Sequence, residues 1–202
     1  MDINFFKDDL EDNIVKIQYK DIKLFLIKNL FDDEYFNKLQ SEILDLMKYP
    51  ESWKKVDGQE SLPRKVLKNI ESSKLLDDLN RNLKHSKLLS YVNEIMDENY
   101  TSCSIVVWWD TFDYFIGWHC DNDSISASMQ LYVTDVKHNH LGTSFAYPDD
   151  EDNKNPANTT FLTLPYIQNS GYLFKNTNTI RHGMTTPVPD GFDRISLYFY
   201  IN

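Results

Sequence analysis

The hydrophobic pattern changes its period near residue 100, and this change limits the fold more than any other feature of the 202-residue chain. Before that point, apolar residues recur at three- and four-residue steps, which is the spacing of one helix face. Beyond it, short runs of β-branched and aromatic residues alternate with turn residues, which is typical of strands. The chain therefore predicts a mainly β protein with helices in its first half, of the α+β class.

The first half contains three helical patterns. Apolar residues from Phe36 to Leu46 predict a helix that begins at the acidic residues 32–34 and ends before Pro50, because a residue that precedes proline is pushed out of the helical region. Two shorter helices are expected, and residues before the first helix alternate enough for one or two strands. These segments are 73–83 and 86–96 for the helices and 14–30 for the strands.

The second half predicts an antiparallel sandwich or barrel that packs against the helices on one side. Turn-forming residues separate the expected strands, and the acidic segment 149–155 is expected to be a loop. We expect one domain over 1–202, with an N-terminal strand and support helices in 1–99 and a β core in 100–202. The strands are expected at 104–109, 126–132, 159–164, 172–174 and 195–201.

Composition excludes several classes of function. The net charge of −10 argues against a protein that coats nucleic acid, because such binding depends on lysine and arginine. Two cysteines, Cys103 and Cys120, form no disulfide framework. No segment approaches the roughly 20 apolar residues of a membrane-spanning helix, and the first residues lack the features of a signal peptide. We therefore expect an intracellular, cytoplasmic protein with reduced thiols.

One histidine and one carboxylate lie two residues apart in a segment expected to be extended. Side chains at such positions leave a strand on the same face, so His119 and Asp121 could bind one metal ion. A third ligand would come from another strand, and His182 lies in a second extended segment. Two histidines and one carboxylate form the ligand set of non-haem iron(II) oxygenases. The alternative is that the short motif arises by chance.

A second pair of polar residues strengthens the metal interpretation. Arg194 and Ser196 follow His182 and share one face of the last expected strand. A guanidinium and a hydroxyl that project together suit one carboxylate of a short dicarboxylic acid. The alternative is an edge-strand arginine that pairs with Asp193 or with another surface acid.

The remaining histidines offer a competing site. His138 and His140 form a His-x-His pair, as in a cupin, but no acidic residue follows within the next few positions. We interpret them as loop residues and His85 as a solvated residue at a helix end. The tryptophans and tyrosines near His119 are expected to be core residues, although some of them would line a pocket if one exists.

The ordered set of motifs in the second half resembles the iron(II)- and 2-oxoglutarate-dependent oxygenases, in particular the group similar to prolyl 4-hydroxylases. The resemblance covers roughly residues 100–202, and the helical half resembles the support helices of that group only loosely. The segments that carry it are Trp118-His119-Cys120-Asp121-Asn122, Gln130-Leu131-Tyr132-Val133-Thr134-Asp135, Leu141-Gly142-Thr143-Ser144-Phe145, Gly171-Tyr172-Leu173-Phe174, His182-Gly183, Pro187-Val188 and Gly191-Phe192-Asp193-Arg194-Ile195-Ser196-Leu197.

The resemblance implies a double-stranded β-helix, or jelly roll, with iron(II) inside its open end. It implies that His119, Asp121 and His182 bind the iron and that Arg194, assisted by Ser196 and Tyr132, binds the distal carboxylate of 2-oxoglutarate. Dioxygen would be the oxidant, ascorbate an accessory reductant, and succinate and carbon dioxide the co-products. The chain departs from the family at Trp109, where a tyrosine is common, and at residues 142–144, where Gly-Gly-Glu-Thr is more usual.

The leading hypothesis is therefore a hydroxylase of this family, with either a protein or peptide side chain or a small molecule as its substrate. Asp121 favours hydroxylation, or demethylation through a hydroxymethyl product, because related halogenases lack this carboxylate. Trp109, Asn122 and Arg181 are the candidate substrate contacts. The alternative is a jelly-roll module without metal that binds a peptide or a sugar.

Overall fold

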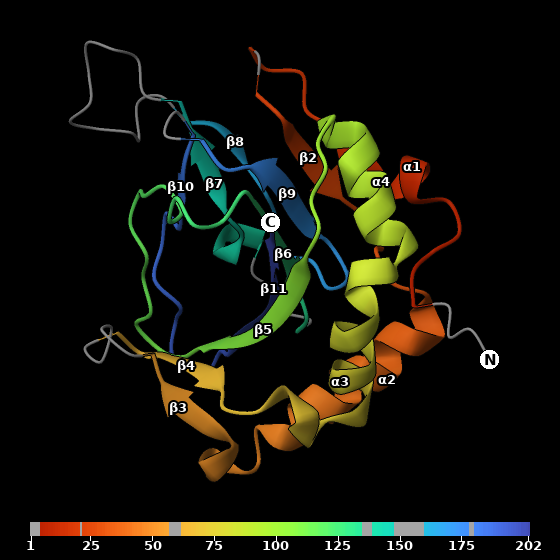
Figure 1. Ribbon diagram of the computed structural model, residues 1–202. Coiled ribbons are helices and arrows are strands. Elements are labelled where there is room, and N and C mark those ends of the chain that lie inside the picture. Colours follow the sequence, from red (N-terminus) through yellow and green to blue (C-terminus); the bar gives the residue numbers. More distant parts are fainter. Residues whose placement is uncertain (1–4, 21, 57–61, 135–138, 148–159, 178–179) are drawn as a thin grey trace.

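The largest element of the computed structural model is an antiparallel sheet (Figure 1). The structure describes the chain except for residues 1–4, 21, 57–61, 135–138, 148–159 and 178–179. Within the described residues, eight strands pair in the order β1-β2-β9-β6-β11-β5-β4-β3. They are β1 Ile14–Lys16, β2 Leu24–Ile27, β3 Trp53–Lys55, β4 Arg64–Leu67, β5 Cys103–Asp110, β6 Ala127–Tyr132, β9 Gly171–Lys175 and β11 Arg194–Ile201. Both halves of the chain thus contribute strands to one sheet.

A smaller antiparallel sheet covers one face of the large one. Its described strands pair in the order β10-β7-β8, with bounds β7 Ser144–Ala146, β8 Thr160–Thr163 and β10 Arg181–Gly183. Phe145 of β7 packs against Tyr172 and Phe174 of β9, with ring centroids 5.0 and 5.9 Å apart. Two facing sheets of this kind form a jelly roll, so the predicted fold class is confirmed.

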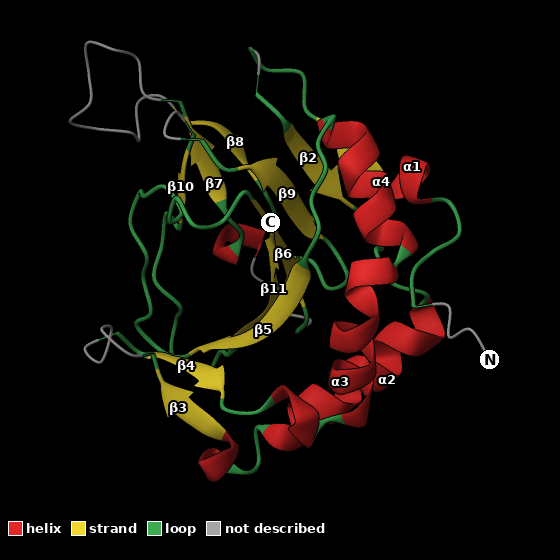
Figure 2. Cartoon of the chain, viewed as in Figure 1, coloured by secondary structure: helices red, strands yellow, loops and turns green. Residues whose placement is uncertain are grey.

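Helices cover the opposite face of the large sheet (Figure 2). Local hydrogen bonds explain where they begin: the side chain of Asp32 accepts from Glu34 N, and the hydroxyls of Ser73 and Ser86 each accept from a backbone N–H three residues later. The three helices expected from the sequence are confirmed. The helices are α1 Leu10–Asn13, α2 Asp33–Leu46, α3 Lys74–Asn82 and α4 Lys87–Met96, with 3-10 turns η1 Pro50–Ser52, η2 Ile70–Ser72, η3 Leu83–His85 and η4 Asn139–Leu141.

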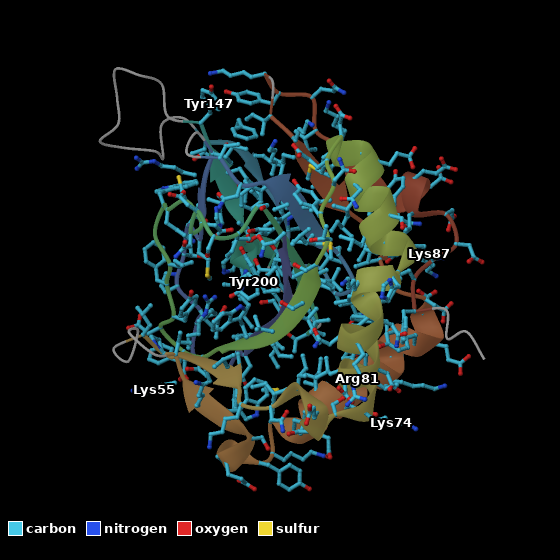
Figure 3. The ribbon with its side chains drawn as sticks, in the orientation of Figure 1. Lys55, Lys74, Arg81, Lys87, Tyr147 and Tyr200 are labelled. Atoms are coloured by element: carbon cyan, nitrogen blue, oxygen red, sulfur yellow. The ribbon has the colours of Figure 1, made fainter. Side chains whose placement is uncertain are left out.

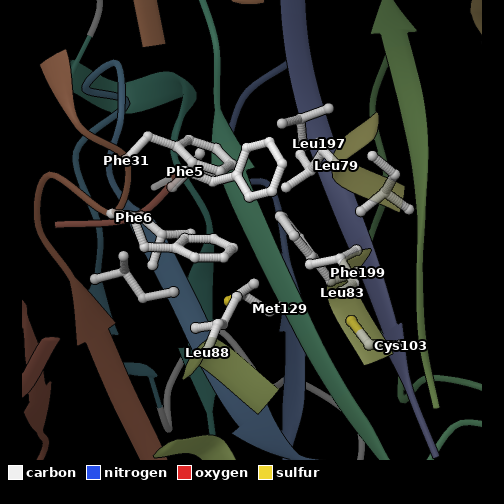
Figure 4. Close-up of a cluster of buried hydrophobic side chains, with 14 of the residues drawn as sticks. Phe5, Phe6, Phe31, Leu79, Leu83, Leu88, Cys103, Met129, Leu197 and Phe199 are labelled. Carbon is white, nitrogen blue, oxygen red and sulfur yellow. The ribbon is translucent and has the colours of Figure 1, made fainter. Parts of the chain in front are cut away.

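The main hydrophobic core lies between the helices and the sheet. Leu79 and Leu88 of the helices face Met129, Leu197 and Phe199 of the sheet (Figure 4). All five side chains are buried, and burial of each such side chain stabilises the fold by roughly 1.5–3 kcal/mol.

The pleat of β11 separates this core from a second, polar face. Ile195, Leu197 and Phe199 point toward the helices, whereas Arg194 and Tyr198 line a cavity on the other side. Tyr200 lies on that cavity side as well, within the ring of strands and loops, while Arg81 and Lys87 lie on the outer helical side (Figure 3).

Three strands, β3, β4 and β7, were not expected from the residue pattern, whereas β10 falls in the extended segment expected around His182. Each has only three or four residues, which is too short to show a period, and β4 begins with the charged residues Arg64 and Lys65. In the described part of the chain, the structure contains no helix with the length and apolar character needed to span a membrane.

Candidate metal centre

Three side chains with metal-binding atoms meet at the junction of two segments. His119 and His182 pair as an antiparallel bridge, in which each backbone N–H donates to the carbonyl of the other residue, at 3.0 and 2.9 Å. Asp121, two residues after His119, projects to the same side. One ligand atom from each of the three residues lies within 4.8 Å of the others. The structure thus brings together the three residues that the resemblance implies as iron ligands.

The two oxygens of the Asp121 carboxylate have different surroundings: one accepts hydrogen bonds, and the other lies near the two histidines. Oδ2 accepts hydrogen bonds from the hydroxyls of Ser128 and Tyr198. Oδ1 lies 3.5 Å from His182 Nε2 and 3.9 Å from His119 Nε2. Burial raises the pKa of Asp121, but its interactions with His182 and the two hydroxyls outweigh burial and lower the pKa below its usual range. The group is therefore an anion at neutral pH, as a metal ligand must be.

The ring of His119 is fixed in the tautomer that a metal ligand needs. Its Nδ1 lies 2.8 Å from the carbonyl oxygen of Gly117. A carbonyl oxygen only accepts, so Nδ1 carries the proton and Nε2 keeps its lone pair for a metal. Burial, with a further effect of the neighbouring His182, lowers the pKa of His119 to about 4. The imidazole is therefore neutral at physiological pH.

His182 is buried on the aromatic side of the centre. Its ring lies 5.0 Å from that of Phe174 and 6.1 Å from that of Phe145, between centroids. Its Nδ1 has no hydrogen-bond partner among the described residues. Packing rather than a second hydrogen bond thus fixes its orientation. Two imidazole nitrogens and one carboxylate oxygen fit a divalent iron ion of the facial-triad type.

A cavity of about 380 Å³ opens beside these ligands. Aromatic and aliphatic side chains form part of its wall, including Trp108, Tyr198 and Tyr200. Its volume and mixed lining are typical of a site for small molecules. The polar residues of the wall, beyond the three candidate ligands, include Arg64, Asn122, Gln130, Thr143, Tyr172 and Arg194.

Arg194 lies in the wall of the cavity, almost fully buried, and its guanidinium is already paired. Nη1 donates to Asp110 Oδ2 at 2.6 Å, and Nε donates to the carbonyl of Leu141 at 2.9 Å. Burial lowers the pKa of Arg194, but the Asp110 carboxylate and the neighbouring tyrosines Tyr132, Tyr166 and Tyr114 together raise it above its usual value. Asp193, the partner considered from the sequence, instead accepts from Trp109 Nε1.

Ser196 and Tyr132 lie near Arg194 but outside the lining of the cavity. Ser196 Oγ accepts from Gln130 Nε2 at 2.8 Å, and the hydroxyl of Tyr132 donates to Thr143 Oγ1 at 2.9 Å. Ser196 and Tyr132, the predicted 2-oxoglutarate contacts, therefore hold Gln130 and Thr143 in place, and Gln130 and Thr143 face the cavity. Sequence reasoning missed Gln130 and Thr143, although Gln130 is two residues from Tyr132 and thus on the same strand face.

The three candidate substrate contacts occupy different places. Asn122 is exposed and lines the cavity, whereas Arg181 is half-buried and outside its lining. Trp109 was expected to contact the substrate, but it lies outside the lining of the cavity. It points to the helical side of β5, where its ring centroid lies 5.1 Å from that of Trp53. Alternate residues of a strand face opposite sides, so its neighbour Trp108 lines the cavity instead.

The other histidines do not join the cluster in the described part of the chain. His85 is exposed at the end of η3, as expected, and His140 is exposed in η4. His138 and the acidic segment 149–155 lie outside the described residues. Arg64 of β4 is a functional candidate that sequence reasoning missed, since nothing local marks it as a neighbour of residue 110.

Comparisons with known proteins agree on the fold. No family model and no curated protein sequence matches the chain. Among solved structures, a Pseudomonas putida prolyl-4-hydroxylase is similar with a TM-score of 0.65 and 13% identity, over 96% of this chain and 95% of that one. A Trichoplax adhaerens prolyl hydroxylase bound to a peptide fragment of hypoxia inducible factor has a TM-score of 0.61 and 13% identity, over 96% and 86%.

A third solved structure of the same fold contains a metal and a cosubstrate. The epimerase SnoN, in complex with Fe3+, alpha ketoglutarate and nogalamycin RO, has a TM-score of 0.62 and 11% identity, over 91% of this chain and 80% of that one. These likenesses extend over nearly the whole chain, including its helical half. The chain therefore has the jelly-roll fold of the iron- and 2-oxoglutarate-dependent oxygenases, in the form found in prolyl 4-hydroxylases.

Proposed function

We propose that this protein is an iron(II)- and 2-oxoglutarate-dependent oxygenase that hydroxylates a peptide side chain or a small molecule. The observation that carries the proposal is the convergence of His119, Asp121 and His182 in a cavity that also contains Arg194. The fold neighbours support it, because one is bound to a peptide and another to nogalamycin RO, Fe3+ and alpha ketoglutarate.

In this proposal His119, Asp121 and His182 would hold the iron, and the hydroxyls of Ser128 and Tyr198 orient the Asp121 carboxylate by donating to its Oδ2. A set of only three protein ligands would leave the iron open to 2-oxoglutarate. When bound, iron(II) would supply the oxidative chemistry in which dioxygen delivers one oxygen atom to succinate, formed from 2-oxoglutarate with loss of carbon dioxide, and the other to the hydroxylated product.

The chain also supplies a binding end for the distal carboxylate of 2-oxoglutarate. Arg194 provides the positive charge, and Gln130 and Thr143 provide amide and hydroxyl groups on the cavity wall. Ser196 and Tyr132 hold these two side chains in place through hydrogen bonds. The site thus has a chelating end at the metal and a cationic end at Arg194, which suits a 2-oxo acid with a second carboxylate.

The test is turnover of the cosubstrate in the absence of a known substrate. Protein purified without oxygen is mixed with iron(II) and 2-oxoglutarate and exposed to air, and succinate is measured over time. We expect slow succinate formation that exceeds a protein-free control. An Asp121→Ala variant should lose most of its iron affinity and its succinate formation, whereas an Arg194→Ala variant should weaken 2-oxoglutarate binding far more than iron binding.

A His85→Ala variant is the matched control, because His85 is an exposed histidine at the end of η3 and outside the cavity. It should bind iron and form succinate like the unaltered protein. If iron-loaded protein neither binds 2-oxoglutarate nor forms succinate, the oxygenase proposal is wrong, and a jelly-roll binding module becomes the better explanation.

A further inference from the structure

One buried carboxylate in this fold is shared by two guanidinium groups. Asp110, at the end of β5, pairs across the sheet with Arg194 of β11 on one side and with Arg64 of β4 on the other. Arg64 donates from Nε to Oδ1 at 2.5 Å and from Nη2 to Oδ2 at 3.1 Å, and Arg194 Nη1 donates to Oδ2 at 2.6 Å. The register of three strands thus creates a row of alternating charges.

The two guanidinium groups of this row line the cavity, whereas Asp110 has no exposed surface. Two positive charges and one negative charge leave the row with a net positive charge. A buried carboxylate needs only one well-placed cation to be neutralised. The second cation therefore has a role that charge balance within the apo protein does not explain.

Arg64 is held rigidly in this position. Its guanidinium carbon lies 4.8 Å from the ring centre of Trp108 and 4.2 Å from that of Tyr114. The start of β4 is also fixed, because both the backbone N–H and the hydroxyl of Thr111 donate to the carbonyl of Pro63. The side chain of Arg64 keeps 11% of its surface exposed, compared with 2% for the side chain of Arg194.

We propose that Arg64 is a positioning residue that neutralises Asp110, so that the charge of Arg194 remains available to the distal carboxylate of 2-oxoglutarate. This inference rests on the oxygenase function proposed above. Without Arg64, the Asp110 carboxylate would match the charge of Arg194 and would repel a second carboxylate in the same cavity. With Arg64, the row offers one uncompensated positive charge to an anion.

Charge balance at the loaded centre supports this assignment. Iron(II) and Asp121 leave one net positive charge at the metal, and the row of Arg64, Asp110 and Arg194 adds another. These charges together equal the two negative charges of 2-oxoglutarate. Buried charges are tolerated when they are paired, so removal of Arg64 would leave the loaded cavity with an unpaired negative charge.

The experiment measures ligand binding by isothermal titration calorimetry without oxygen, with manganese(II) in place of iron(II). The ligands are 2-oxoglutarate and pyruvate, which has the same chelating end but no distal carboxylate. The variants are Arg64→Met, Asp110→Asn and the double variant, which restores the net charge of the row. Thermal unfolding of each variant reports whether it is folded.

We expect Arg64→Met to weaken 2-oxoglutarate binding by about 10- to 100-fold, the range for a lost charge-assisted interaction in a partly buried site. Pyruvate binding should change by less than about threefold. The double variant should recover most of the affinity for 2-oxoglutarate, because its remaining arginine faces an uncharged asparagine. A merely structural role of Arg64 would weaken the binding of pyruvate as much as that of 2-oxoglutarate.

The outcomes separate the two proposals. If the unaltered protein binds no 2-oxoglutarate, the oxygenase function fails, and the inference about Arg64 fails with it. If the unaltered protein binds 2-oxoglutarate but Arg64→Met binds it equally well, only the inference is wrong. It is also wrong if 2-oxoglutarate and pyruvate weaken together, or if the folded double variant binds no better than Arg64→Met. If Arg64→Met fails to fold, the double variant alone tests the inference. The inference then requires the double variant to recover most of the affinity of the unaltered protein for 2-oxoglutarate.

Discussion

A glycine next to His182, one of the three candidate metal ligands, provides a sharp test of the geometry. Gly183 follows His182 in β10 and lies against the segment that leads to His119. A Cβ atom at this position would lie 2.8 Å from Gly117 O, 2.9 Å from Gly117 C and 3.0 Å from Ile116 O. All three are backbone atoms. To reach ordinary contact at 3.4 Å, these atoms must move by roughly 0.4–0.6 Å.

Gly183→Ala should therefore weaken metal binding as well as stability. The displaced carbonyl of Gly117 is the acceptor that fixes the His119 ring, at 2.8 Å from Nδ1. Loss of a hydrogen bond that orients a metal-binding histidine typically costs about 10- to 100-fold in metal affinity. The overpacking itself should cost about 1–3 kcal/mol of unfolding free energy. The measurements are calorimetric titration with manganese(II) and urea unfolding.

Gly191→Ala is the matched control. Gly191 has a φ of +77° and open space around its Cβ position, so alanine there is strained by about 1–2 kcal/mol without touching the site. It should lose stability but bind manganese(II) normally. Unchanged metal affinity in Gly183→Ala would refute the reasoning, and an equal loss of metal affinity in both variants would show that affinity merely follows stability.

Three further predictions concern stability. Ser73→Ala removes the hydroxyl that accepts from Leu76 N at 3.1 Å and should cost about 1 kcal/mol in urea unfolding, so no change would argue against the cap. Leu79→Ala, at a fully buried position, should lower the free energy of unfolding by about 2–5 kcal/mol. Leu44→Ala, on the exposed side of α2, should change it by less than about 0.5 kcal/mol, and similar values for the two variants would contradict the described core. Burial raises the pKa of Cys103 from 9.0 to about 12, so this thiol adds no pH dependence below pH 9, and stability should fall as pH rises from 9 toward 12. Urea unfolding at about pH 8 and about pH 10.5 checks this sign, and equal stability at both would contradict it.

Much of the secondary structure follows from the sequence because its causes are local. The spacing of Leu39 and Ile43, which are buried in α2, and the side chains of Ser73 and Ser86 that cap α3 and α4 act within one or two helical turns. The longer strands, such as β5 and β11, are rich in β-branched and aromatic residues over eight residues each, which is long enough for the pattern to predict a strand. Short strands such as β3 carry too few residues to show a hydrophobic period.

The sequence also determined part of the candidate metal centre. His119 and Asp121 share a face because they lie two residues apart in an extended segment, which is a local property. The choice of His182 as third ligand depended on the order of motifs in a resembling family. Only the tertiary structure placed it, through the two backbone hydrogen bonds with His119.

The charge network around Asp110 was decided by tertiary structure alone. Its partners, Arg64 and Arg194, are 46 and 84 residues away in the chain, and only the register of β4, β5 and β11 brings them together. That register also decides that Trp108 rather than Trp109 faces the cavity. A shift of one residue would exchange the two faces of a strand, and the burial of entire strand faces against the helices fixes the pairing. The sequence by itself thus determined the helices, the longer strands and two neighbouring candidate ligands, while long-range strand pairing decided which charges meet.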